Sequence, residues 1–219
     1  MATAADSTPV VQWPPTESSG MWAATRTTTR LLEGLFDPAA EAVWEEFDRR
    51  YRPIIVGLAR KLGLPEEDAA DVAQETLARF VKAYRAREYD RNRGRLRSWI
   101  IGIAKYRIAD AARAKAGRRG WRGDSVIGDF PDQKELDTIW DTERRQAILR
   151  QAIEQLRADS KASEKTIGAF EMLTFHGRPA AAVAEELGMT LNDVYQAKNR
   201  IAARLREIVA RLEKLYDED

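Results

Sequence analysis

The strongest chemical feature of the sequence is a run of basic side chains in its first half. Residues 85–122 contain thirteen Lys or Arg residues against three Asp or Glu residues, a net charge of +10. Guanidinium and ammonium groups at this density are typical of surfaces that hold a polyanion such as a nucleic acid. The segment therefore indicates a candidate nucleic-acid contact.

An acidic segment follows directly and reverses the charge. Residues 124–143 contain seven Asp or Glu residues and one Lys, whereas the whole chain carries 36 Lys or Arg and 35 Asp or Glu residues. Gly120, Gly123, Gly128 and Pro131 interrupt the region. The composition predicts a flexible, solvated acidic linker over residues 116–141.

The residue inventory excludes several classes of enzyme. The chain has no cysteine, so disulfides, thiolate zinc sites and cysteine nucleophiles are absent from it. His176 is the one histidine, which disfavours a zinc-hydrolase centre. Metal chemistry at Asp110 or Glu185, in a nucleic-acid-processing enzyme, is disfavoured because no second carboxylate is placed to share an ion. We expect no catalytic residues, no metal and no cofactor.

Length and hydropathy limit the architecture and the compartment. A chain of 219 residues permits one or two domains, and we expect two small helical ones. No run of about 18 apolar residues is present, and the first residues lack the pattern of a signal peptide. The sequence therefore predicts a cytoplasmic protein without a membrane segment.

The elements that position the basic run are predicted from helical periodicity. Residues 1–30 are rich in Thr, Ser, Ala and Pro and read as a disordered tail. A helix is expected after Asp37 and Pro38, and "GLP" at 63–65 separates it from a second helix. In that second helix the buried stripe is complete, so polar side chains lie on its outer face. These are Asp71, Gln74, Glu75 and Arg79.

Two further stretches complete the expected organisation. Residues 85–97 read as a loop, after which Ser98 is predicted to cap a helix that runs to Lys115 and turns Trp99 inward. Near the end of the chain, Pro179 opens a short helix, Gly188 permits a turn and Thr190 caps the next helix. This order predicts a helix-turn-helix.

Taken together, these stretches resemble a sigma factor of bacterial RNA polymerase, of the extracytoplasmic-function (ECF) type. "DVAQETLARFVKAY" and "RSWIIGIAKYRIADAAR" resemble helices of sigma domain two, and "FHGRPAAAVAEELGMTLNDVYQAKNRIAARLRE" resembles domain four. The resemblance assigns residues 31–115 to domain two, 116–141 to the linker and 142–215 to domain four. It implies an all-α transcription initiation factor that binds core RNA polymerase and promoter DNA.

The resemblance gives the outer face of the second helix a role. In the family this helix docks on the clamp helices of the largest polymerase subunit, at the positions that Asp71, Gln74 and Glu75 occupy here, with Arg79 beside them. A solvated face supported by the Glu75–Arg79 pair is the structural alternative.

The resemblance also implies two DNA-reading surfaces. In the first, cations hold the backbone of the melted minus-ten element while a planar group stacks on an extruded base; its candidates are Arg91, Asn92, Arg93, Arg95, Lys105, Tyr106, Arg107 and Arg113. The second reads the minus-thirty-five element in the major groove; its candidates are Thr190, Asn192, Tyr195, Gln196, Asn199 and Arg200. Many family members have Asn at the position of Tyr106 and Arg at that of Ala197.

A conventional helix-turn-helix regulator is the alternative reading. Such a protein dimerises on a palindrome and needs no polymerase docking. The sigma reading also admits an anti-sigma factor as a further partner.

Overall fold

A computed structural model describes residues 28–37, 39–89, 94–118, 130–158 and 163–216. These residues form eight α-helices and no strand, so the predicted all-α fold is confirmed. The helices are α1 (Thr28–Gly34), α2 (Glu41–Lys61), α3 (Glu66–Arg85), α4 (Leu96–Arg118), α5 (Gln133–Ala158), α6 (Glu164–Thr174), α7 (Ala180–Leu187) and α8 (Leu191–Tyr216). Within the described ranges, no helix is long and apolar enough to cross a membrane.

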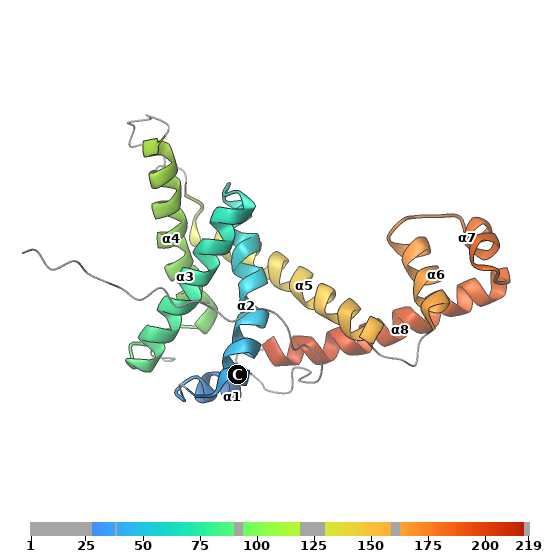
Figure 1. The fold of residues 1–219 in the computed structure, drawn as a ribbon, viewed down its shortest axis with the longest axis horizontal. Coiled ribbons are helices and arrows are strands. Elements are labelled where there is room, and N and C mark those ends of the chain that lie inside the picture. The colour runs from blue at the N-terminus through green and yellow to red at the C-terminus, as the bar shows by residue number, and fades with distance from the viewer. Residues whose placement is uncertain (1–27, 38, 90–93, 119–129, 159–162, 217–219) are drawn as a thin grey trace, which may run out of the picture.

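Helices α1 to α4 form one unit, and α6, α7 and the start of α8 form another (Figure 1). Two long helices connect them. Helix α5 leads from the first unit towards the second, and α8 returns from the second unit to α1 and α2 (Figure 1). One hydrophobic core continues from α1 through α5 to α8, and a smaller cluster lies among α6, α7 and α8.

Helices α2 and α3 pack along the stripes that the sequence predicts. Phe47 of α2 stacks on Phe80 of α3 with ring centroids 5.1 Å apart, and both side chains are almost fully buried. Three acidic residues lie in the first turn of α3, where the helix dipole favours negative charge. The helix therefore has a suitable start, and its apolar face is covered by α2 and α4.

Helix α4 begins earlier than the sequence predicts. Leu96 is its first residue and is buried, whereas Ser98 is exposed within the first turn, so the prediction that Ser98 caps this helix is wrong. The helix starts where the side chain of Leu96 enters the core, and Ser98 does not mark its start. Trp99 meets Phe80 edge-on at 5.3 Å and stacks on Tyr89 at 5.0 Å, as expected of a core-facing residue.

Part of the predicted linker is helical. Residues 133–141 belong to α5, and residues 116–118 belong to α4, so the prediction of a flexible linker is wrong for both stretches. Residues 119–129 lie outside the described residues. Asp132 caps α5 by accepting a hydrogen bond from the Glu135 backbone N–H at 2.8 Å, and Glu135 accepts one from the Asp132 N–H at 3.2 Å. Leu136 and Trp140 are buried in the core.

The turn between α7 and α8 has the local geometry expected from its residues. Gly188 adopts a left-handed conformation, with φ 60°, that a residue with a side chain rarely takes. The Thr190 hydroxyl accepts a hydrogen bond from the Asp193 N–H at 3.1 Å, and Asp193 Oδ2 accepts from the Thr190 N–H at 3.3 Å. This reciprocal pair fixes where α8 starts.

The other end of α8 is held by a buried polar cluster, which we call the C-terminal clamp: Thr28, Glu46, Arg50, Leu215 and Tyr216. The Leu215 carbonyl accepts hydrogen bonds from Thr28 Oγ1, at 3.0 Å, and from the Arg50 guanidinium. Arg50 is 2% exposed, pairs with Glu46 at 2.7 Å and lies over the Tyr216 ring. The last turn of a helix leaves carbonyls without partners and carries partial negative charge, so a guanidinium there is stabilising.

We expect Arg50→Met to destabilise the fold. The change removes the hydrogen bond of the guanidinium to the Leu215 carbonyl, which keeps Thr28 as a donor, and one of the two cationic partners of Glu46. Loss of a hydrogen bond to a charged group costs roughly 1.5–3 kcal/mol. Urea unfolding measures the loss. Arg49→Met is the matched control because Arg49, the next residue, is a half-exposed cation that also pairs with Glu46. The clamp is contradicted if both variants lose the same stability.

We also expect the fold to weaken in strong alkali through Tyr216. Burial raises the pKa of Tyr216 to about 12, although the nearby Arg50 acts in the opposite direction. A tyrosine in the unfolded chain has a pKa of about 10. The folded state therefore holds the phenolic proton more tightly. Its stabilisation is full below about pH 10 and is lost as the pH rises to about 12.

Unfolding free energies between pH 9 and about 12 measure this loss, which for two pKa units is roughly 2–3 kcal/mol. Tyr216→Phe cannot ionise, and we expect its profile to be flatter by that amount. Tyr106→Phe removes an exposed hydroxyl and should retain the slope of the unchanged protein. A Tyr216→Phe profile that is as steep as the control would contradict the assignment.

Candidate functional site

The outer face of α3 presents the polar residues that the sequence places there. Asp71, Gln74, Glu75 and Arg79 are all exposed, while the opposite side of the helix, from Ala69 to Phe80, is buried against α2 and α4. The helix therefore needs none of the four for its own packing. A polar face on a fully packed helix is free to contact a partner.

An ion pair connects this face to α4. Arg107 reaches Glu75 at 3.5 Å and also pairs with Asp110 at 3.1 Å. The side chain of Arg107 is 23% exposed and that of Glu75 is 62% exposed. The structure thus brings together two residues that the sequence assigned to different surfaces. Arg107 is less available to DNA than the sequence suggests.

Helix α4 presents one side chain that is almost fully free. Tyr106 is 71% exposed, the largest value among the exposed large hydrophobic residues of the described chain. Lys105 is exposed but lies over the Phe130 ring at 5.3 Å, and Arg113 pairs with Asp110. Arg95 is exposed at the start of the helix, whereas Arg91, Asn92 and Arg93 lie outside the described residues. The ring of Tyr106 is therefore the best-presented group on this helix for stacking on a base.

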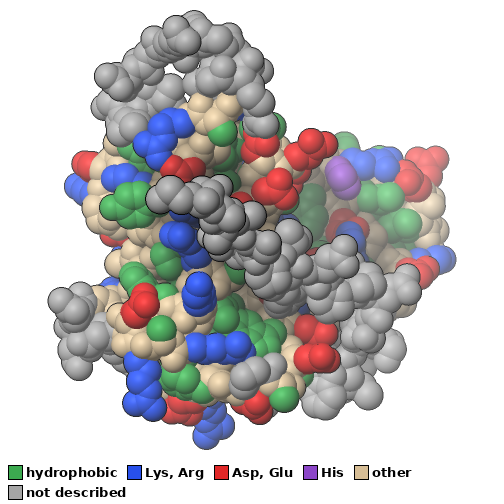
Figure 2. Space-filling view, turned by 60° about the vertical axis from the view of Figure 1, so that its left-hand side comes forward, with side chains coloured by type: hydrophobic (Ala, Val, Ile, Leu, Met, Phe, Trp, Pro, Cys, Tyr) green, Lys and Arg blue, Asp and Glu red, His purple; other side chains and the backbone are tan. Residues whose placement is uncertain are grey.

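Lys and Arg side chains run in a broken band down the near face of the molecule in Figure 2. This view brings forward the side of the first unit that carries α4 (Figures 1 and 2). Asp and Glu side chains lie mainly beside the band. A band of one sign suits an extended polyanion better than a compact ligand.

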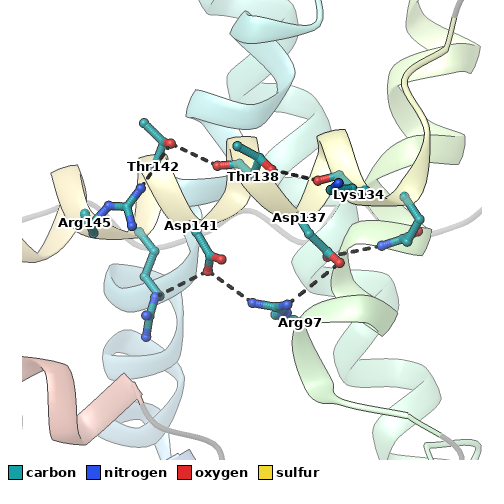
Figure 3. A network of polar contacts seen from close by, with 9 residues as sticks. Arg97, Lys134, Asp137, Thr138, Asp141, Thr142 and Arg145 are labelled. Carbon is teal, nitrogen blue, oxygen red and sulfur yellow. Dashed lines mark hydrogen bonds and ion pairs between the residues drawn. The ribbon is translucent and has the colours of Figure 1, made fainter.

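Two acidic residues of the expected linker, Asp137 and Asp141, form ion pairs within the chain. Arg97 of α4 pairs with Asp141 at 3.1 Å and with Asp137 at 3.8 Å, so it lies between two carboxylates of α5 (Figure 3). Arg144 also approaches Asp141, at 3.9 Å. The charge of this segment thus neutralises part of the basic run. The sequence analysis missed this pairing, although carboxylates four residues apart in 137–141 are a signal for one helix face.

The exposed face at the start of α8 contains all six residues predicted for it. Thr190, Asn192, Tyr195, Gln196, Asn199 and Arg200 are exposed, whereas Val194, Ala197 and Ile201 are buried on the opposite side. Ala197 is 3% exposed, so a long side chain at this position would point into the cluster beneath α8. This face belongs to the second unit, away from α3 and α4 (Figure 1).

The described residues contain no group of three or more His, Asp or Glu side chains that could hold a metal ion. His176 is exposed between α6 and α7. The described residues present three candidate binding surfaces. These are the polar face of α3, the exposed ring of Tyr106 among cations on α4, and the polar face at the capped start of α8.

Comparison with known families finds a match for the part of the chain that contains α3 and α4. Residues 47–118 match the family model of sigma-70 region 2. The matched segment is similar to sigma-70 region 2. It covers about a third of the chain and spans most of α2 with all of α3 and α4. No curated protein matches the chain.

Region 2 binds core RNA polymerase and minus-ten promoter DNA, and its presence supports a role as a sigma factor of the sigma-70 family in transcription initiation. Sigma factors are not enzymes, and the catalytic centre is that of the polymerase. The exposed face of α3 and the ring of Tyr106 both lie within the matched region 2.

Proposed function

We propose that the chain is a sigma factor of the ECF type that recruits core RNA polymerase to promoters and opens them. The observation that carries the proposal is the placement, within region 2, of a free polar face on α3 beside an exposed tyrosine on α4. One surface serves the polymerase and the other serves the DNA. A single compact unit of three helices can therefore deliver a promoter strand to the enzyme it is docked on.

The docking surface in this proposal is the outer face of α3. Asp71, Gln74 and Arg79 have no hydrogen bond or ion pair to the described residues, so they are available to the clamp helices of the largest polymerase subunit. Glu75 is engaged only through one of its oxygens, by Arg107 at 3.5 Å. A long, exposed pair of this kind is weak and is readily exchanged for a partner in the complex.

The minus-ten surface is the exposed part of α4. Opening a duplex costs a few kcal/mol for each unstacked base step. Stacking of an extruded base on the ring of Tyr106 offsets about 1–3 kcal/mol of that cost, and Arg95, Lys105 and Arg113 hold the backbone. Arg107 acts mainly by joining α3 to α4.

The minus-thirty-five surface is the start of α8. In this proposal α7 crosses the DNA backbone while Gln196, Asn199 and Arg200 face base edges in the major groove. Helix α8 is 26 residues long, which is about 39 Å. We call the exposed face at the start of α8 the reading face. The far end of α8 is held in the C-terminal clamp, so one continuous helix sets the direction of the reading face relative to region 2.

We expect the double substitution Asp71→Arg and Gln74→Ala to abolish binding of core polymerase. Both side chains are exposed, so the change in folding stability should stay within about 0.5 kcal/mol. A pull-down with purified core polymerase measures binding, and circular dichroism checks the fold. Glu45→Arg, an equal charge reversal on the exposed face of α2, is the control and should bind normally.

Retained polymerase affinity in the double variant would refute docking through α3. If the unmodified chain binds no polymerase but binds palindromic DNA as a dimer, the conventional helix-turn-helix regulator is the correct reading instead.

Two exposed tyrosines allow the roles of the two proposed DNA-reading surfaces to be tested separately. Tyr106 on α4 and Tyr195 on α8 are 71% and 53% exposed, so each can be changed to Ala without disturbing a core. On a promoter selected in vitro with the holoenzyme, we expect Tyr106→Ala to reduce strand opening about 10-fold or more, as loss of one stacked base implies. Upstream contacts should remain. Tyr195→Ala should weaken upstream binding instead.

Permanganate reactivity of the downstream element measures opening, and protection of the upstream element from nuclease measures duplex binding. Each variant is the control for the other. Equal losses in both assays for both variants would mean that the two surfaces do not have separate roles.

A further inference from the structure

A pocket lies between α2 and α5, outside the surfaces described above. Its volume is about 590 Å³, within the range of small-molecule sites. Pro53, Val56 and Gly57 of α2 form an apolar wall, and Glu143 of α5 packs against Gly57. Cationic side chains line much of the remainder, among them Lys61 and Arg150. We call this the α2–α5 pocket.

Glu143 is the unusual residue of the pocket. It is 4% exposed, and no described residue forms a hydrogen bond or an ion pair with it. Its carboxylate lies so close to α2 that a Cβ at Gly57 would be 2.1 Å from Glu143 Oε2. A glycine at position 57 therefore leaves room for the carboxylate. The carboxylate belongs to the lining of the pocket, so a ligand there that donates hydrogen bonds would meet an acceptor.

The neighbouring arginines are already engaged. Arg52 pairs with Asp48 at 2.7 Å, and Arg60 pairs with Glu66 at 3.0 Å. Lys61 and Arg150, in contrast, are exposed and have no ion pair with the described residues. The pocket thus offers a buried acceptor at one place and free cations at its rim. Its complement is a molecule with a donor edge, a flat apolar face and an anionic end.

We propose that the α2–α5 pocket binds a guanine nucleotide. Guanine carries two adjacent donors on one edge, the N1–H and the N2 amine, which can meet both oxygens of a carboxylate. Adenine presents an unprotonated nitrogen at the corresponding place, which a carboxylate repels. The purine face suits the wall of Pro53 and Val56, and the phosphates meet Lys61 and Arg150.

The proposal concerns the chain alone and does not depend on polymerase binding. A ligand that contacts both α2 and α5 binds only the folded arrangement of these helices, so it must raise the melting temperature. Isothermal titration of the purified full chain with GDP, ADP and inorganic pyrophosphate is the direct test. We expect GDP to bind at least 10-fold more tightly than ADP, and pyrophosphate to bind weakly.

Three variants test the carboxylate, the cations of the pocket and a control cation outside it. Glu143→Gln keeps the size of the side chain but presents an amide donor to guanine, and it should remove the preference for GDP over ADP. The double variant Lys61→Ala and Arg150→Ala should weaken both nucleotides alike. Arg145→Ala removes an exposed cation of α5 that does not line the pocket, and it should leave binding unchanged.

No binding of GDP to the unmodified chain would overturn the proposal. Equal binding of GDP, ADP and pyrophosphate would also overturn it, because the cations would then be attracting any polyphosphate. These comparisons use the unmodified protein, so they decide the matter even if Glu143→Gln perturbs folding.

Discussion

The attachment of the end of α8 to α2 depends on a buried guanidinium. Arg50 is desolvated in the middle of α2, which lowers the pKa of its side chain. Its charge is tolerated because Glu46, the Leu215 carbonyl and the Tyr216 ring surround it. The end of α8, in turn, needs donors for its last carbonyls. The guanidinium gains acceptors and the helix end gains a donor, so the last turn of α8 becomes part of the core around α2.

Helix α5 makes the second connection, and its acidic side chains explain how. Asp132 and Glu135 start the helix, Asp137 and Asp141 hold Arg97, and Leu136 and Trp140 fill the core on the other side. The acidic residues that predict a solvated spacer in the sequence therefore cap α5 and form ion pairs with Arg97. The basic run loses some of its charge to these pairs and to Asp110. The group that stays most exposed on α4 is the ring of Tyr106.

The sequence predicts those elements whose signals are local. A full apolar stripe with a Gly-Leu-Pro break is enough for α2 and α3, and a cap with a left-handed glycine is enough for the start of α8. The exposure of the six residues predicted between positions 190 and 200 follows from the helical register that this cap fixes. The first turns of α5, residues 133–141, were assigned to the linker because they are acidic and have few apolar positions, so composition outweighed the spacing of Leu136 and Trp140. Burial of Arg50, Glu143 and the last turn of α8 depends on contacts between distant parts of the chain, which no local pattern reports.

The two connections leave the candidate binding faces uncovered. The outer face of α3 and the reading face of α8 are exposed while α8 is docked on α2 and α5 lies against α4. Neither face contributes a side chain to the C-terminal clamp. A partner could therefore occupy either of them without first breaking the core. The exposed face at the start of α8 and the C-terminal clamp share one helix, and the clamp end of that helix is held by α2, which also packs against α3.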